Sequence, residues 1–532
     1  MPITWKQEIA KENYKMFLDY QGHRRQWERD AIRFEDFRYG SHFSKAEEAE
    51  LLKFRQAPLP ISITTAIMDT AEAMMISSNP IIKTAPLINP FDDNYTMRSK
   101  KIAQIYDFLL KKSWNDSLGG LQYDRVIKDQ GNVGHGLFYI VPRNEYGEFS
   151  VDIKHLNWRY FYPDPQVKDP FYENMDNAVI AMEVSKIHAF KLVKSLDENI
   201  TEKHFEDNFV KGFESTTNSI EPSLRYKASK PGNNNIPFIQ RMTMEEETVY
   251  ILTPKKVQEN SRGLETGFRT VTVITPEIEQ KVRDGLLDVK TRRKMQLVEY
   301  TSIGGMGYKK VYPISKYNIV PVVYDHRDSP YPLGRVWYLY PLQRALNKFI
   351  MIAIINGSLM NTSRVVAEAQ SIVNKDEWKT NFNTPGAMLE WRQSIPGQTK
   401  APMFMEGKPL SDAWLRFPQY LTSQMEYISG IFGVMMGDNS NSSDIFSTVA
   451  ALQSAGGQKI KRRMTQVDAA LSRVGEVTAE FYKEYAPPNG YAIEIDKSNL
   501  NADPTVQTYN RMIPNPQNNQ EVMIDPETDL GN

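Results

Sequence analysis

Three acidic residues are the best candidates for acid–base or metal chemistry in this sequence. Asp164, Asp169 and Glu173 lie close together in the chain, and carboxylates that converge in space can bind metal ions or transfer protons. They stand among prolines and aromatic residues, where aspartate also stabilises turns. We favour turns here. The alternative is a metal-dependent hydrolase or nuclease that uses Asp164 and Asp169.

No recognisable catalytic or metal-binding motif accompanies these carboxylates. The chain has no cysteine, which excludes disulfides, thiolate zinc sites and a cysteine nucleophile. It lacks a phosphate-binding P-loop, the zinc-protease pattern H-E-x-x-H and the nucleophile pattern G-x-S-x-G. Its seven histidines are scattered without the spacing of metal ligands. The sequence therefore predicts that the protein is not an enzyme and holds no metal and no cofactor.

A basic stretch on a long predicted helix, from the residues after 443 to about 485, is the next candidate site. An apolar stripe at helical spacing marks one side of it, formed by Ile460, Met464, Val467, Leu471 and Val474. Lys459, Arg462 and Arg473 project from the opposite side. Two interpretations stay open: a solvated outer face, or a face turned toward a polyanion.

The segment 437–443, which precedes this helix, consists of small polar residues. It contains no cation, so it cannot hold phosphate by charge. Because affinity for DNA grows with each contact between a cation and a phosphate, a surface over which DNA slides should use few cations. The segment is therefore either a contact for a moving polymer or a flexible connector.

Composition limits the class of protein. The chain has 532 residues, a length that suggests about three or four domain-sized units, and 41% of its residues are hydrophobic. Its 64 Lys and Arg nearly balance its 65 Asp and Glu, which argues against a protein that binds nucleic acid over its whole surface. The longest dense apolar run, 349–355, is far shorter than the roughly 18 residues of a membrane span. No membrane span is predicted.

The first half of the chain mixes helices and strands. Arginines alternate with aromatic residues in 1–43, which suits nucleic-acid stacking or, as we favour, an amphipathic helix docked on the body. Ser44 and Glu47 form a capping box before a helix to about residue 55. Further helices are expected at 63–74 and 98–114, with a short strand at 81–85.

Two-residue periodicity predicts strands in the middle of the chain. The segments 137–141 and 148–153 read as a β-hairpin. The segment 214–237 has the composition of a mobile linker. The glycine cluster 304–307 lies between two strands, so we expect a hairpin turn rather than a phosphate loop. Further strands are expected at 178–184, 248–252, 269–274, 297–302 and 308–312.

The second half is mainly helical. The segment 342–356 is apolar nearly all round, so it needs burial on several sides, in a large core or between subunits. Another helix is expected at 411–431, kinked at Pro418 or beginning its main part there. A hinge is considered at Gly456-Gly457 in the long final helix. The chain from residue 501 has the composition of a tail that is disordered or folds on a partner.

The order of these segments resembles that of portal proteins, the head-to-tail connectors of tailed bacteriophages, of a podovirus-like kind. The resemblance covers roughly residues 34–485 and rests on segment order. The stretches that carry it are FEDFRYGSHF, APLPISITTAIMDTAEAMMISSNPIIKTAP, DQGNVGHGLFYIVP, YFYPDP, PYPLGRVWYLYPLQRALNKFIMIAIINGS and ISGIFGVMMGDNSNSSDIFSTVAALQSAGGQ.

The resemblance implies an α+β protomer of the portal type that assembles as a ring. The division it implies is an N-terminal arm (1–43), a mixed wing (44–341), a first stem helix (342–363), a small clip (364–409), a second stem helix (410–432), a tunnel loop (433–445), a long helix on the wing and crown side (446–486), and a short crown or flexible tail (487–532).

The resemblance also implies a function. The ring, usually of twelve subunits, would form the channel at one capsid vertex through which double-stranded DNA is packaged and ejected without regard to sequence. Its partners would be the terminase large subunit, a tail adaptor or head-completion protein, and the major capsid or scaffolding protein. The protein would assemble in the cytoplasm of the host bacterium and reside in the virion. A self-associating scaffold protein is a further alternative.

Three groups of residues follow as predicted sites. Cations and loop residues would contact DNA in the channel: Lys459, Arg462, Arg463, Asp438, Asn439, Ser440, Asn441 and Ser442. Residues of the clip would dock partners, unless the clip is only an exposed loop around one packed tryptophan: Lys375, Trp378 and Lys379. Apolar residues of the stem helices would pack between subunits: Phe349, Ile350, Ile352, Trp414 and Phe417.

Overall fold

The chain forms two compact units in a computed structural model. The first comprises Met1–Arg33, Glu72–Gly334 and Lys459–Asn532, and the second comprises Phe34–Ala71 and Arg335–Gln458. The structure describes residues 4–53, 58–77, 80, 82–88, 90–145, 148–211, 235–254, 269–271, 276–284, 287–360, 364–368, 371–380, 388–392, 401–405, 411–436, 446–485, 491–493, 507–509, 512–514 and 521–523.

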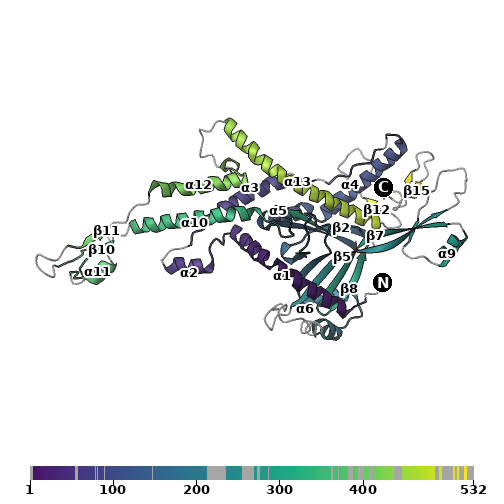
Figure 1. Cartoon of the computed structure of the whole chain (residues 1–532), viewed down its shortest axis with the longest axis horizontal. Helices are drawn as coiled ribbons and strands as arrows, with labels where there is room; N and C mark the ends of the chain where they lie inside the picture. Colours follow the sequence, from purple (N-terminus) through teal and green to yellow (C-terminus); the bar gives the residue numbers. More distant parts are fainter. Residues whose placement is uncertain are drawn as a thin grey trace. The chain divides into compact units, whose positions relative to one another are not determined.

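The first unit is built on a six-stranded antiparallel sheet. Its strands lie side by side in the order β3-β4-β5-β7-β8, and β6 pairs with β5. Figure 1 labels β5, β7 and β8 of this sheet. The predicted hairpin at the glycine cluster is confirmed, because β7 turns into β8 at Gly304, whose φ of 57° suits glycine. The strands are β3 (Phe161–Pro163), β4 (Asn177–Ser185), β5 (Asn235–Pro254), β6 (Arg269–Val271), β7 (Leu287–Ile303) and β8 (Met306–Tyr312).

A second sheet of the same unit has three antiparallel strands in the order β2-β1-β9. The predicted hairpin is confirmed: β1 (His135–Glu145) pairs with β2 (Glu148–His155) from Phe138 opposite His155 to Glu145 opposite Glu148. On its other edge β1 pairs with β9 (Ile319–Val323). Helix α5 (Gly119–Val133) packs against this sheet through Tyr123, Val126 and Ile127, all of which are buried.

Helix α1 (Gln7–Arg38) contributes its residues up to 33 to the first unit, where it is docked as predicted. Tyr14, Phe17 and Leu18 form one buried cluster with residues of β3, β4 and β5. Arg24 is fully buried, with its guanidinium 4.4 Å from the Tyr162 ring, and it donates to the carbonyl of Trp158 at 2.8 Å. The arginine and aromatic residues of this helix therefore anchor it on the sheet.

The strand expected at 81–85 is wrong over its described part. Residues 82–88 form no strand, and side chains of α4 (Asp93–Asp116) accept from two of their backbone N–H groups. The Asp107 carboxylate accepts from the Thr84 N–H, and Ser99 Oγ accepts from the Leu87 N–H at 2.7 Å. Helix α4 also begins earlier than expected, since the Asp92 carboxylate caps it by accepting from the Tyr95 N–H at 3.0 Å.

Apart from the second part of α13 (Phe446–Glu484), the remaining elements of the first unit are short. The helices are α6 (Lys186–Leu196), α7 (Glu202–Phe205), the π-helical turn η2 (Glu206–Val210), the turn η1 (Trp158–Tyr160) and α9 (Pro276–Arg283). Near the end of the chain two antiparallel pairs form, β12 (Tyr491–Ile493) with β13 (Gln507–Tyr509) and β14 (Met512–Pro514) with β15 (Glu521–Met523).

The second unit is mainly helical. The predicted capping box before α2 (Lys45–Lys53) is confirmed, because the Ser44 N–H donates to the Glu47 carboxylate at 2.7 Å and the Glu47 N–H donates to Ser44 Oγ at 3.3 Å. The other elements of this unit are α3 (Ile63–Ile76, to residue 71), α10 (Arg335–Met360), β10 (Arg364–Val366), α11 (Lys375–Thr380), β11 (Met403–Met405), α12 (Asp412–Ser429), the 3-10 turn η3 (Gly433–Met436) and the first part of α13 (Phe446–Glu484).

The long helices are more extended than the segments expected from the sequence. Helix α10 begins at Arg335, before the expected segment 342–356, because Val336 and Leu339 are fully buried and packing favours the helix upstream. Helix α12 continues through Pro418. Helix α13 runs unbroken through Gly456-Gly457, so the pair does not interrupt the helix, and a hinge there stays a prediction.

Candidate functional site

The acidic residues singled out in the sequence build a loop. Asp164 accepts from the Gln166 N–H at 2.9 Å and from the Asp176 N–H at 3.2 Å. Asp169 accepts from the backbone N–H groups of Phe171 and Glu173 at 3.1 and 3.0 Å. The side chain of Glu173 forms an ion pair with Arg473. These carboxylates are therefore used within the fold, and the turn interpretation is the one that their contacts support.

The basic stretch of α13 is exposed on the side opposite its apolar stripe. Ile460, Val467 and Leu471 are buried, whereas Lys459 and Arg462 are exposed. Lys461, which the apolar stripe does not point out, is exposed as well. The run of four cations in residues 459–463 is the sequence signal from which Lys461 could have been predicted as part of the basic surface.

Arg463 and Arg473 differ from the other cations of α13. The guanidinium of Arg463 lies 4.1 Å from the Tyr324 ring and donates to the Tyr324 carbonyl, so this side chain fastens α13 to the end of β9. Arg473 pairs with Glu173 and, at 2.7 Å, with Glu476. The basic character of α13 is therefore concentrated at residues 459–462.

Three glutamates hold the second half of α13 against the rest of the first unit. Glu476, Glu480 and Glu484 recur every four residues and so share one face. Glu476 pairs with Lys316, Glu480 accepts from the Ser315 N–H at 2.6 Å, and Glu484 accepts from Lys294 at 2.6 Å. Burial acts to raise the pKa of Glu476, but its bonds with Lys316 and Arg473 hold that pKa below its usual value.

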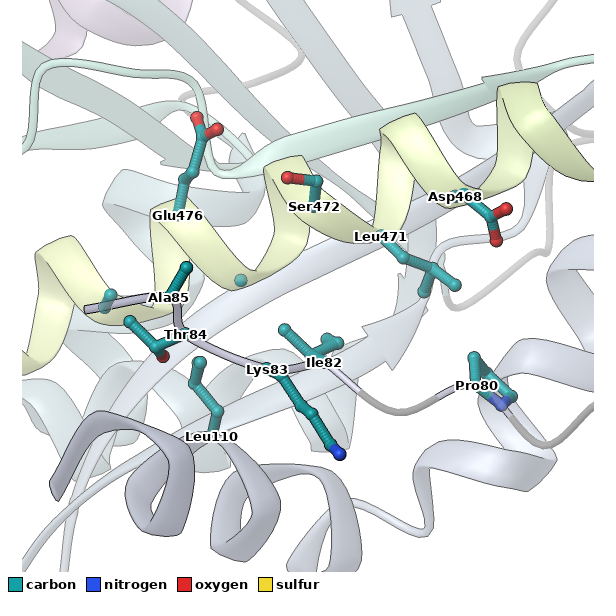
Figure 2. A pocket seen from close by; sticks show the side chains of 12 residues that line it. Pro80, Ile82, Lys83, Thr84, Ala85, Leu110, Asp468, Leu471, Ser472 and Glu476 are labelled. Atoms are coloured by element: carbon teal, nitrogen blue, oxygen red, sulfur yellow. The ribbon is translucent and has the colours of Figure 1, made fainter. Parts of the chain in front are cut away.

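A cavity of about 500 Å³ lies beside this part of α13 and is also lined by Pro80, residues 82–85 and Leu110 of α4 (Figure 2). Its carboxylates, Asp468 and Glu476, sit at opposite ends of it (Figure 2). They are eight residues apart, which is about 12 Å along a helix and too far to share one metal ion or proton. Among the residues that the structure describes, no group of three or more His, Cys, Asp or Glu could hold a metal ion.

The apolar residues predicted to pack between subunits come together in the second unit. The Phe349 ring of α10 lies 5.1 Å from Trp414 and 4.5 Å from Phe417 of α12. Phe349, Ile350 and Ile352 are half-buried, while Trp414 remains 43% exposed and Phe417 38%. Tyr427 of α12 is 69% exposed and was missed, because a lone tyrosine in a helical pattern carries no signal of its surroundings.

The residues predicted to dock partners lie on α11 of the second unit. Lys375 and Lys379 are exposed, and Trp378 is half-buried with its indole N–H donating to the Glu390 carbonyl at 3.0 Å. Strands β10 and β11 pair antiparallel in the same stretch of chain, from Arg364 opposite Met405 to Val366 opposite Met403.

The loop residues predicted to contact DNA, 438–442, lie outside the described residues. The described neighbours of that segment are η3 before it and α13 after it. In the described parts of the chain, no helix is long and apolar enough to cross a membrane.

The candidate site thus consists of helix surfaces in an α+β protein, with carboxylates that serve turns and ion pairs, which is typical of a structural protein. The comparison with known families makes the class specific, because residues 14–530 match the model of the phage P22-like portal protein. Since that match covers nearly the whole chain, the chain belongs to the phage P22-like portal protein family. No curated protein matches the sequence.

Family membership gives the protein its function. It is a portal, the head-to-tail connector of a tailed bacteriophage, with a role in DNA packaging. Portal proteins are structural proteins of the virion that act as oligomeric rings at a capsid vertex, in contact with capsid and terminase partners. The resemblance read from segment order is therefore confirmed, and the alternatives of a hydrolase and of a separate scaffold protein find no support.

Proposed function

We propose that this portal is a ring of twelve copies in which residues 342–363 and 410–432 form the stem, 364–409 the clip and 433–445 the tunnel loop. The wing would be 44–341, with 1–43 as an arm, 446–486 as the helix on the crown side and 487–532 as the crown or tail. The observation that supports this proposal is the aromatic surface of α12, where Trp414 and Phe417 pack on Phe349 of α10 and remain partly exposed. Such a surface is stable in water when a neighbouring copy covers it.

The test of the ring is the native mass of the purified protein, together with negative-stain images. We expect a closed ring with a central hole, because heterologous contacts between copies close into a ring when the rotation between them allows it. A protein that stays monomeric at high concentration would contradict the proposal.

The proposed DNA contacts are Lys459, Arg462 and Arg463 of α13, with residues 438–442 as the contact that moves. The exposure of Lys459 and Arg462 supports this assignment. Arg463 would act mainly by holding α13 in place, since its guanidinium already lies on Tyr324. Cations that meet phosphates without reading bases give binding that is independent of sequence and weakened by salt.

The double variant Lys459→Glu with Arg462→Glu tests these contacts. We expect rings of normal mass that bind double-stranded DNA more weakly, with a shallower dependence on salt, and particles that retain less DNA. Lys281→Glu with Arg283→Glu on α9 is the matched control, because it changes the charge by the same amount on exposed side chains elsewhere. Equal DNA retention in the two double variants at several salt concentrations would contradict the assignment.

The remaining parts of the proposal concern partners. Lys375, Trp378 and Lys379 of α11 would dock the terminase large subunit during packaging and a tail adaptor or head-completion protein afterwards. The wing would meet the major capsid or scaffolding protein, and the ring would assemble in the cytoplasm of the host bacterium. The exposure of both lysines beside an anchored tryptophan supports a docking role for α11.

A further inference from the structure

Two glycines bring the end of α12 into direct contact with α13 in the second unit. Helix α12 ends at Gly430, whose φ of 75° is left-handed and whose N–H bonds to the Glu426 carbonyl at 2.8 Å. Gly456 of α13 is buried against this turn. A Cβ atom on Gly456 would lie 2.3 Å from the Gly430 carbonyl oxygen and 2.8 Å from Cε of Met435. Only glycine fits at position 456.

The next residue provides a built-in comparison. A Cβ atom on Gly457 would meet nothing within 4 Å. Both glycines lie inside a helix of 39 residues, where glycine is less favourable than alanine. The close approach of two backbones accounts for glycine at 456 and does not account for glycine at 457.

The Gly430 carbonyl cannot easily move away from α13. The chain after it is fixed by a hydrogen bond from the Ile431 N–H to Ser429 Oγ at 3.1 Å, and Ile431 is fully buried. The side chain of Met435, in the turn η3, also covers Gly456. The structure therefore joins the elements on both sides of residues 437–445 at one point.

We infer that Gly456 is a positioning residue of the portal, because its contact with the Gly430 carbonyl sets the angle at which α13 leaves the end of α12. Helix α13 begins at Phe446, ten residues earlier, so the lever from the contact to the start of the helix is about 15 Å. A tilt of roughly 10° at the contact would move that start by roughly 3 Å. The inference rests on the proposed function, in which residues 433–445 contact DNA.

A pair of spin labels within one copy tests the angle directly, since the chain has no cysteine of its own. Ser423→Cys on α12 and Ser447→Cys near the start of α13 would carry the labels, and labelled copies would be diluted with unlabelled copies in the ring. We expect Gly456→Ala to shift the distances between the two labels by roughly 3 Å, the displacement of the lever. Gly457→Ala should leave them unchanged. The same distances in the parent and in both variants would overturn the inference.

A second variant decides the matter if Gly456→Ala does not assemble. Ser429→Ala removes the hydroxyl that accepts from the Ile431 N–H, so the Gly430 carbonyl can move away from Gly456. The contact should then loosen, and the measured distances should spread over a wider range than in the parent. An unchanged spread would overturn the inference.

DNA retention in particles separates this inference from the proposed function. If Gly456→Ala shifts the label distances and retention stays normal, the positioning role stands and the DNA contact by residues 433–445 is wrong. If retention falls while the distances stay the same, the positioning role is wrong. A shift in distance together with a loss of retention supports both.

Discussion

The second half of α13 and the α10–α12 pair are both long helical surfaces, and their apolar side chains are covered in different ways. Val467, Val474 and Phe481 of α13 are fully buried within the first unit. On α12, by contrast, Tyr427 is 69% exposed, and Trp414 remains 43% exposed although Phe349 of α10 packs beside it. The first surface is covered by its own chain, and the second leaves aromatic side chains exposed, which we propose that a neighbouring copy covers.

The polar contacts of the two surfaces follow the same division. On α13, three glutamates every four residues bind a loop and a strand of the same unit. On α12, Thr422 and Ser423 return their hydroxyl groups to the helix's own carbonyls. In a ring, a covered helix suits the body of each copy, and an uncovered aromatic face suits the contact between copies.

The largest expected effect is on assembly. Trp414→Ser with Phe417→Ser should prevent or strongly weaken ring formation, because each large apolar side chain contributes about 1.5–3 kcal/mol when buried and the loss recurs at every contact between copies. Circular dichroism should stay nearly unchanged. Sedimentation over a range of concentrations measures the effect. Rings as stable as those of the parent would show that α12 does not face a neighbour.

The next effect is on folding of the chain itself. Phe481→Ala removes a fully buried ring that lies 5.9 Å from Tyr312, so we expect the free energy of unfolding to fall by about 3–5 kcal/mol. Tyr427→Ala, which truncates an exposed ring, is the matched control and should change this quantity by less than about 0.5 kcal/mol. Urea unfolding of dissociated subunits gives both values. Similar losses in the two variants would remove the distinction between the surfaces.

Local patterns in the sequence were sufficient for much of this comparison. The capping box at Ser44 depends on residues three positions apart, and helical spacing alone identifies the buried stripe with Ile460 and Val467. Strand periodicity located both hairpins of the first unit. In each case the structure follows from neighbours along the chain.

Contacts between distant residues were beyond the reach of those patterns. Arg473 pairs with Glu173, which is 300 residues away, so a residue expected on a basic face is neutralised. Arg463 bonds with Tyr324, 139 residues away. A strand was expected at 81–85, but side chains of α4 take the backbone N–H groups of Thr84 and Leu87. The pattern of a single sequence does not indicate which residues, far apart in the chain, will contact each other in the fold.

Acid should destabilise the first unit through His135. Burial, with a further contribution from the charge of Arg24, lowers the pKa of His135 from 6.5 to about 3. Below about pH 6.5 the unfolded chain takes up a proton that the folded chain does not, so the free energy of unfolding should fall by about 1.4 kcal/mol per pH unit. The decrease continues down to the folded pKa.

Urea unfolding between about pH 6.5 and pH 5 measures this decrease against His135→Gln, which has no imidazole to protonate. The variant should lose less stability over that range than the parent. Parallel profiles would mean that His135 takes up its proton equally well when folded. His135 also lies 3.1 Å from the Tyr172 hydroxyl, so the comparison is between slopes and not between absolute stabilities.

The smallest effect belongs to the ion pair at the end of α13. Lys294 Nζ lies 2.6 Å from the Glu484 carboxylate, and both side chains are partly exposed. Because solvent screens such pairs, Glu484→Gln should lower the free energy of unfolding by less than about 1 kcal/mol. The loss should shrink as salt is added, because salt screens the parent's ion pair and leaves the neutral variant unaffected. Urea unfolding at low and high salt measures it. A loss that is large and independent of salt would mean that α13 is held by this one carboxylate, and not by the buried side chains that set it apart from α12.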